Sequence, residues 1–297
     1  MPFWQLTVPA TAEVSDGLTN FLWEQGALGV VEEEVPGQPP RLRAFFPESA
    51  PSTGLLSAVH AYQASLRTLG FSLPPESAEI APLLDEAWAS AWQQSFPVRE
   101  VGRRLLVMPP WIADPDPDST TPNGERLTVV IEPGRAFGTG HHGTTEGCLV
   151  LLEDALEAAP GSAVLDIGTG TGILAIAALR LGAPSVLAID TDPDAVAAAE
   201  VNAARNGCAG LTVRLAEPQD VEGRFPVVVA NLLTHAHLGL AAHYARLVAP
   251  GGHLVLGGML DGEDLRVAEA LSALGFGTRW SVPLDGWASL LLAAPAR

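Results

Sequence analysis

Residues 164–172 read Val-Leu-Asp-Ile-Gly-Thr-Gly-Thr-Gly, and this stretch decides the fold. An apolar run of strand character ends in glycines spaced two apart, and the apolar run 173–181 that follows is typical of a helix. Glycine permits positive φ angles and lets a ligand approach the backbone closely. A glycine turn between a strand and a helix predicts a nucleoside-binding site in an α/β sheet.

The spacing of these glycines distinguishes two cofactors. Dinucleotide-binding turns follow Gly-x-Gly-x-x-Gly, which from Gly168 and Gly170 would require a third glycine at Ile173. The third glycine is Gly172 instead. Asp166 lies two residues before the turn, where a carboxylate would repel a pyrophosphate but suits the positive groups of S-adenosylmethionine. We therefore favour S-adenosylmethionine, with a nicotinamide dehydrogenase as the alternative.

Short apolar runs alternate with helical stretches along the rest of the C-terminal part. The expected strands cover residues 127–131, 163–167, 185–189, 211–215, 225–230 and 253–257. Because strands that are apolar throughout are buried by helices on both faces, the pattern predicts an α/β fold with a doubly wound, Rossmann-like, mostly parallel sheet. Ligands bind such sheets outside the carboxyl ends of the strands.

Two polar residues follow later strands at that edge of the sheet. Asp190 lies 22 positions after Gly168, where a carboxylate accepts hydrogen bonds from a ribose. We favour this role over helix capping, which suits Asp192 better. Asn231 ends another strand and offers a carbonyl oxygen to an amine, although a simple turn residue would occupy the same position.

The first eighty residues predict a separate, smaller domain. Strands are expected at 3–8, 28–35, 41–46 and near 71–73, and helices at 15–25 and 55–69. The order βαββαβ is that of an α+β ferredoxin-like fold. We expect this domain at 1–80, a linker helix at 81–97 with Trp88 and Trp92 in a packing stripe on one face, and the cofactor-binding domain at 98–297.

Composition narrows the function classes. The net charge is −18, and all 16 basic residues are arginine. The absence of lysine excludes a lysine Schiff base, a pyridoxal-phosphate anchor and a Walker-type phosphate lysine. The acidity argues against a broad nucleic-acid surface; it suits a cationic substrate, or solubility alone. Two cysteines (Cys148 and Cys208), no membrane-length apolar run and no signal peptide lead us to expect a cytoplasmic protein.

A second glycine-rich loop, residues 136–145, reads Ala-Phe-Gly-Thr-Gly-His-His-Gly-Thr-Thr and precedes a helix. Neighbouring histidines rarely face one ion, and no third ligand stands at helical spacing, so we expect no metal. A mobile loop that closes over a ligand is the preferred interpretation. The other histidines of the C-terminal part are scattered and are expected on the surface or in the core: His235, His237, His243 and His253.

Together these segments resemble the bacterial ribosomal protein L11 methyltransferase (PrmA-type) family over essentially the whole chain. The resemblance rests on residues 137–145, 164–178, 188–192, 230–233 and 249–260, and its specific element is the Phe-Gly-Thr-Gly-His loop. It implies contacts with S-adenosylmethionine at Thr145, Gly168, Asp190 and Asn231. It also implies a flap over the methionine end, formed by Phe137, Gly138 and Thr139. Asp166, Gly170 and Gly172 complete the expected cofactor site.

The resemblance further implies an activity. Methyl groups would pass from S-adenosylmethionine, leaving S-adenosylhomocysteine, to lysine side chains and the N-terminal α-amine of ribosomal protein L11, free or on the ribosome. The N-terminal domain would recognise that protein, and the linker helix would let the catalytic domain of a monomer reach several amines. We expect Asn231 and the Leu232 carbonyl to orient the amine, with solvent taking its proton.

Two further alternatives concern the function. A non-catalytic ribosome-binding protein would keep the cofactor fold without activity, and a small-molecule or glutamine-modifying methyltransferase is the nearest rival. The glutamine enzymes carry Asn-Pro-Pro-Tyr where residues 231–234 read Asn-Leu-Leu-Thr. Gly143 stands where members of the family often carry Glu or Pro.

Overall fold

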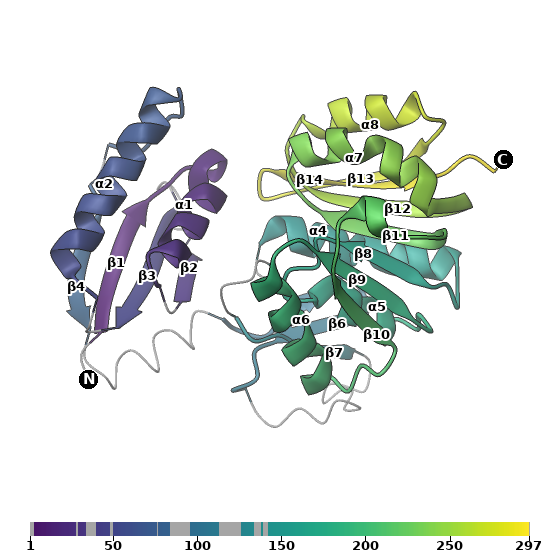
Figure 1. Cartoon of the computed structure of the whole chain (residues 1–297), viewed down its shortest axis with the longest axis horizontal. Helices are drawn as coiled ribbons and strands as arrows, with labels where there is room; N and C mark the ends of the chain where they lie inside the picture. Colours follow the sequence, from purple (N-terminus) through teal and green to yellow (C-terminus); the bar gives the residue numbers. More distant parts are fainter. Residues whose placement is uncertain are drawn as a thin grey trace. The chain divides into compact units, whose positions relative to one another are not determined.

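The chain divides into two compact units, Met1–Pro97 and Val98–Arg297 (Figure 1). The computed structural model describes residues 3–27, 29–33, 40–47, 50–75, 77–83, 96–112, 126–133, 138 and 142–296. Of the linker helix predicted at 81–97, residues 84–95, with Trp88 and Trp92, lie outside the described ones, and residues 81–83 belong to a strand instead. None of the helices in the described part is long and apolar enough to cross a membrane.

The first unit has the predicted βαββαβ order. Its elements are β1 (Phe3–Pro9), α1 (Ala12–Glu24), β2 (Gly29–Glu33), β3 (Arg41–Pro47), α2 (Ser52–Thr68) and β4 (Glu79–Leu83). The strands form an antiparallel sheet in the order β2-β3-β1-β4. Apolar side chains of the sheet and both helices, such as Leu6, Leu18 and Val59, form its core. The expected ferredoxin-like α+β fold is confirmed.

The last strand of this unit lies later than predicted. Residues 71–73, expected as a strand, instead connect α2 to β4. Gly70, at φ +95°, ends the helix, and the Phe71 N–H turns back to the Leu66 carbonyl at 3.0 Å. Pro74 and Pro75 follow, and proline cannot donate to a strand ladder. Pairing with β1 therefore begins only at Glu79, and β4 extends beyond residue 80, where we expected the domain to end.

The second unit is built on a seven-stranded sheet. Its strands are β8 (Val164–Ile167), β9 (Val186–Asp190), β10 (Leu211–Leu215), β11 (Phe225–Asn231), β12 (Val248–Leu260), β13 (Gly277–Leu284) and β14 (Trp287–Ala293). In the sheet they lie in the order β10-β9-β8-β11-β12-β14-β13. The first five pair in parallel, and β14 runs antiparallel to both of its neighbours. The predicted mostly parallel sheet is confirmed.

Helices cover both faces of this sheet, as the apolar strands predict (Figure 1). They are α4 (Gly143–Ala158), α5 (Ile173–Arg180), α6 (Pro193–Arg205), α7 (Thr234–Leu247) and α8 (Asp264–Ser272), with a short 3₁₀ helix at Pro218–Asp220. One core cluster contains side chains of α4 and α5, and the other contains side chains of α7 and α8.

The expectation that residues 127–131 belong to the large sheet is wrong. They form β7 (Leu127–Val130), which pairs with β6 (Leu105–Met108) in a three-stranded sheet that also holds β5 (Arg99–Val101). The run is apolar because Val129 and Ile131 pack into the core beside α5. The other edge of β7 bonds to the side-chain amide of Asn206, the residue after α6. Asn206 Oδ1 accepts the Val130 N–H at 2.9 Å, and Asn206 Nδ2 donates to the Val130 carbonyl at 2.6 Å.

The strand order defines where a ligand should bind. From β8 the chain continues to β9 and β10 on one side, and it then crosses to β11 and β12 on the other. The carboxyl ends of β8 and β11 therefore form the topological switch point, at which two connections leave in opposite directions and open a crevice. The glycine turn follows β8, and Asn231 ends β11.

Candidate active site

The glycine turn has the backbone that the sequence predicts. Gly168, Gly170 and Gly172 have φ angles of +73°, +54° and +82°, and the last of them caps α5. A Cβ built on Gly168 would lie 2.6 Å from Leu232 Cδ2. The Gly168 N–H donates to the Ile189 carbonyl at 2.9 Å, so the turn is held to the end of β9. The backbone angle therefore favours glycine at position 168, and a Cβ there would also require the Leu232 side chain to move.

Asp166 lies beneath this turn, without exposed surface. The Thr169 hydroxyl donates to Asp166 Oδ2 at 2.7 Å. Burial raises the pKa of Asp166 to about 7; the hydrogen bond from Thr169 opposes this increase, and the charge of Asp190 adds to it. The carboxyl group thus supports the turn from the interior, and its effect on a ligand would be electrostatic.

Asp190 ends β9 and faces the glycine turn. Its Oδ2 accepts the Gly170 N–H at 2.9 Å, and its Oδ1 accepts the Asp192 N–H at 3.0 Å. A carboxylate oxygen can accept more than one hydrogen bond, so both atoms retain capacity for ligand hydroxyl groups. Asp192 caps α6 by accepting the Asp194 N–H at 2.8 Å, and the predicted capping role of Asp192 is therefore confirmed.

Of the predicted flap, the structure describes Gly138, whereas Phe137 and Thr139 lie outside the described residues. Gly138 has a φ of +108°, and its carbonyl accepts the Thr171 hydroxyl at 2.6 Å. A Cβ at Gly138 would approach Thr171 Oγ1 to 2.8 Å. The flap and the glycine turn, separate in the sequence, are thus brought into contact. After the flap, His142 caps α4 through its ring Nδ1.

Asn231 connects the end of β11 to the first turn of α4. Its Nδ2 lies 3.2 Å from Thr144 Oγ1 and 3.3 Å from Thr145 Oγ1. Thr145 is fully buried, so its contacts in this structure are with protein groups. The Asn231 Oδ1 atom is buried and has no hydrogen-bond partner among the described residues. A buried oxygen without a hydrogen-bond donor is unfavourable in free energy, so a ligand N–H that reached Asn231 Oδ1 would be bound favourably.

Leu232 lies against two glycines at the end of β12. Its N–H donates to the Gly257 carbonyl at 3.0 Å. Gly258 has a φ of +85°, and a Cβ there would collide with the Leu232 carbonyl. The main chain of Leu232 therefore rests directly on Gly257 and Gly258. The described residues contain no group of three His, Cys, Asp or Glu side chains that could surround a metal ion.

Comparison with known proteins identifies the family of this arrangement. The family model described as "Ribosomal protein L11 methyltransferase (PrmA)" matches residues 2–294. The chain belongs to the ribosomal protein L11 methyltransferase family. The resemblance seen in the sequence is therefore confirmed over nearly the full length.

Individual members of the L11 methyltransferase family agree with this assignment. The protein from Marinobacter nauticus is 36% identical over 91% of this chain and 91% of its own length. The protein from Geobacter metallireducens is 34% identical over 98% of this chain and 97% of its own length. A crystal structure of ribosomal protein L11 methylase from Lactobacillus delbrueckii subsp. bulgaricus superposes with a TM-score of 0.61 at 30% identity, covering 67% of this chain and 100% of that one.

Sequence reasoning missed several side chains that hold this L11 methyltransferase site together. The Thr171 hydroxyl donates to the carbonyl of Gly138 in the flap, and the Thr144 hydroxyl accepts from Asn231 Nδ2. Asn202 of α6 is buried; its Nδ2 donates to the Thr171 carbonyl at 2.9 Å, and its Oδ1 accepts the Glu132 N–H at 3.0 Å. Asn202 in α6 and Asn206, the residue that caps its C-terminus, lie four apart and are both buried; two polar residues at this helical spacing were the signal in the sequence that could have indicated them.

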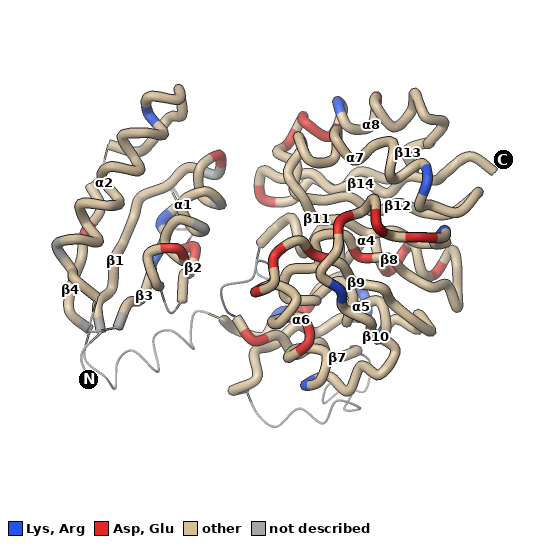
Figure 2. Tube along the Cα trace, viewed as in Figure 1, with Lys and Arg blue, Asp and Glu red and all other residues tan. Residues whose placement is uncertain are grey.

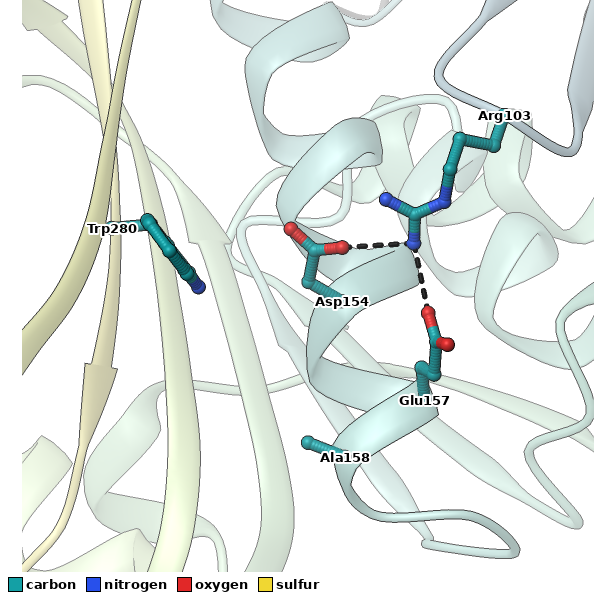
Figure 3. A pocket seen from close by; sticks show the side chains of 5 residues that line it. All are labelled: Arg103, Asp154, Glu157, Ala158 and Trp280. Atoms are coloured by element: carbon teal, nitrogen blue, oxygen red, sulfur yellow. Dashed lines mark hydrogen bonds and ion pairs between the residues drawn. The ribbon is translucent and has the colours of Figure 1, made fainter.

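The charged side chains of this family member are scattered. Figure 2 shows the described arginines on separate elements, interspersed with acidic residues. A hollow of about 540 Å³ is lined by Arg103, Asp154, Glu157, Ala158 and Trp280 (Figure 3). Arg103 donates to Asp154 and to Glu157 at 2.9 Å each. This hollow lies at the last turn of α4, whereas the candidate site lies at the first, so the two are distinct.

Proposed function

We propose that this chain transfers methyl groups from S-adenosylmethionine to amines of ribosomal protein L11. The observation that carries the proposal is the meeting of three segments at the switch point, in a chain of the L11 methyltransferase family. Gly138 of the flap contacts the glycine turn through Thr171. Leu232, next to Asn231, contacts the same turn through Gly168. Cofactor groups and acceptor groups are therefore adjacent.

The residues around the turn fit S-adenosylmethionine. Gly170 carries no side chain, so a ligand can approach its backbone closely, whereas the Cβ position of Gly168 is covered by the Leu232 side chain. Asp190, half-buried at the end of β9, would accept the ribose hydroxyl groups. The buried Asp166 would favour the cationic groups of the ligand, because a nearby positive charge stabilises its ionised form. We propose that Phe137, Gly138, Thr139 and Thr145 enclose the methionine end.

The protein substrate must present a neutral amine to the methyl group. When bound, S-adenosylmethionine supplies a methyl group that its sulfonium charge has already activated. A lysine amine loses a proton before it can attack, which costs about 4–5 kcal/mol at pH 7. The Leu232 carbonyl and Asn231 Oδ1 accept hydrogen bonds from N–H groups, and we propose that they orient the amine lone pair towards the methyl group.

We assign the proton to solvent. Asp166 is fully buried beneath the turn, and both ring nitrogens of the nearby His237 are already hydrogen-bonded within the protein. Neither group is free to act as a general base in this arrangement. Catalysis then depends on holding the amine and the methyl donor in line, and this positioning alone can supply a large part of the rate enhancement.

We further propose that the first unit recognises L11, that the linker carries the second unit to several amines, and that a monomer acts without a metal. The net charge of −18 suits a cationic substrate, free or on the ribosome. Because the proposed substrate is a ribosomal protein, we propose a cytoplasmic location for the enzyme. Lysine side chains and the N-terminal α-amine are the proposed acceptors.

A transfer assay with labelled S-adenosylmethionine tests the proposal. The substrate is a mixture of ribosomal proteins from cells that lack this methylation. Because the enzyme has no lysine, its own side-chain amines cannot take up label, which removes a common background. We expect label in the L11 band, and none when Asn231→Ala replaces the wild type. Label in other bands but not in L11 would overturn the substrate. Binding of NAD(H) without binding of S-adenosylmethionine would revive the dehydrogenase alternative.

A further inference from the structure

A buried histidine lies directly behind the acceptor loop. His237 is in the first turn of α7, which begins immediately after residues 231–233. Its ring has no exposed surface. The sequence pattern predicts only a surface or core position for this residue, and the proposed mechanism gives it no role. Its hydrogen bonds connect it to the groups on which Leu232 rests.

The partners of the His237 ring fix its tautomer. Nε2 lies 2.8 Å from the Gly257 carbonyl, which can only accept, so Nε2 carries the proton. Nδ1 lies 2.9 Å from the hydroxyl of Tyr244, two helical turns further along α7. Burial lowers the pKa of His237 to about 4, although the carbonyls of Gly257 and Leu232 favour the protonated ring. The ring is therefore neutral at pH 7, and Tyr244 donates to Nδ1.

The Gly257 carbonyl joins this histidine to the acceptor loop. It accepts the His237 Nε2–H and also the Leu232 N–H at 3.0 Å. Gly258 has no side chain to separate β12 from the Leu232 carbonyl. A shift of the Gly257 peptide would therefore move Leu232, and a displacement of about 1 Å at a reacting centre can cost about 100-fold in rate.

We propose that His237 is a positioning residue for methyl transfer, which clamps the Gly257 carbonyl and thereby holds Leu232 where it orients the acceptor amine. Tyr244 keeps the ring in the tautomer that this clamp requires. The inference rests on the proposed role of the Leu232 carbonyl. Because His237 has no exposed surface, the proposed role is one of positioning and requires no contact of its ring with the cofactor or the amine.

Three variants separate this role from simple core packing. His237→Leu removes the N–H donor and keeps an apolar side chain. Gln at the same position keeps an amide N–H where Nε2–H was, so His237→Gln is the conservative variant. Leu247→Val is the matched control, because Leu247 is fully buried in the same helix and its aliphatic side chain cannot bond to Gly257.

The kinetic experiment measures kcat and the Kd for S-adenosylmethionine separately in each variant. We expect His237→Leu to lower kcat for L11 methylation about 10- to 100-fold while the Kd for S-adenosylmethionine changes less than about threefold. His237→Gln should recover most of the loss, and Leu247→Val should keep the wild-type kcat. Loss of kcat in all three variants, in proportion to lost stability, would overturn the proposal. So would an unchanged kcat in His237→Leu.

Amide hydrogen exchange at Leu232 provides a readout that does not depend on activity. We expect exchange in His237→Leu to be at least about 10-fold faster than in Leu247→Val, because the partner of the Leu232 N–H is no longer clamped. Equal exchange in the two variants would contradict the clamp. If the wild type does not methylate L11 but the exchange difference is present, then the proposed function fails and the clamp stands.

Discussion

The hydroxyl group of Thr171 donates a hydrogen bond to the carbonyl of Gly138 at 2.6 Å, and this bond joins the flap to the glycine turn. The two residues lie 33 positions apart in the sequence. Both are buried, so the bond is shielded from water. Asn202 holds the Thr171 carbonyl from the other side, at 2.9 Å. Gly138 is therefore tied to the turn that would bind the cofactor, and that turn is itself held by Asn202.

Thr171→Val tests this connection. Valine has nearly the same shape but leaves the Gly138 carbonyl without its donor, which costs about 1–2 kcal/mol. We expect the Kd for S-adenosylmethionine to rise about 5- to 30-fold, mainly through faster dissociation, measured by stopped-flow or calorimetry. The control is Thr212→Val on the exposed edge strand β10, which should bind as the wild type does. Equal dissociation rates in both variants would mean that this bond does not hold the flap.

Gly168→Ala tests the contact between the turn and the acceptor loop. Alanine at a φ of +73° costs about 1–2 kcal/mol, and its Cβ would also displace Leu232. Gly161→Ala is the matched control, because Gly161 has a φ of +69° but open space around it. We expect similar losses in denaturant stability from backbone strain, with kcat/KM lowered at least about 10-fold only in Gly168→Ala. Equal kcat/KM in the two variants would contradict the close approach.

Asp190→Ala tests the ribose contact. We expect S-adenosylmethionine binding to fall below detection in calorimetry while circular dichroism shows a folded chain, since hydrogen bonds to a charged group contribute about 1.5–3 kcal/mol each. Asp192→Ala is the comparison: it removes the cap of α6, which costs about 1 kcal/mol of stability, and it should leave binding intact. Unchanged affinity in Asp190→Ala would show that the site is misplaced.

Asp166 should make stability depend on pH. Its folded-state pKa of about 7 lies above the ordinary 3.8. The contribution of Asp166 to the free energy of unfolding is therefore fully present below pH 3.8 and is lost as the pH rises through 7. Asp166→Asn lacks this titration. We expect its free energy of unfolding, relative to the wild type, to rise by about 4 kcal/mol between pH 4 and pH 8.

Saturating S-adenosylmethionine should shrink the difference between Asp166→Asn and the wild type at pH 8, because a nearby cation stabilises the ionised carboxylate. Parallel stability curves for Asp166→Asn and the wild type from pH 4 to pH 8 would contradict the raised pKa.

The sequence predicted those parts of the molecule that depend on local pattern. Glycines at 168, 170 and 172 have positive φ angles, and the parallel strands around them follow from apolar runs buried on both faces. The family assignment rested on the flap and the turn together. The cap that the sequence specified at Asp192, at the start of α6, is also present, whereas the helix expected to begin at Ser15 begins at Ala12.

The predictions that were wrong or missing concern strand partners and side-chain contacts between distant segments, which no local sequence pattern specifies. Residues 127–131 are as apolar as a strand of the main sheet, yet their partner is β6, which the sequence analysis did not predict, and Asn206 occupies the other edge. The hairpin of β13 and β14 was also missed. Gly143 packs against it, since a Cβ there would lie 2.9 Å from the Leu284 carbonyl. His237 acquires its partners only when α7 folds onto β12.

The most direct test is intact-protein mass spectrometry of purified, unmethylated L11 after incubation with the enzyme and S-adenosylmethionine. Half of the L11 sample is first acetylated on its amines. We predict that untreated L11 gains whole methyl masses, that fragmentation places them on lysine side chains or the N-terminal amine, and that acetylated L11 gains none. Methyl groups on acetylated L11, or no mass gain in untreated L11 while the enzyme binds S-adenosylmethionine, would contradict the proposal that this site methylates amines of L11.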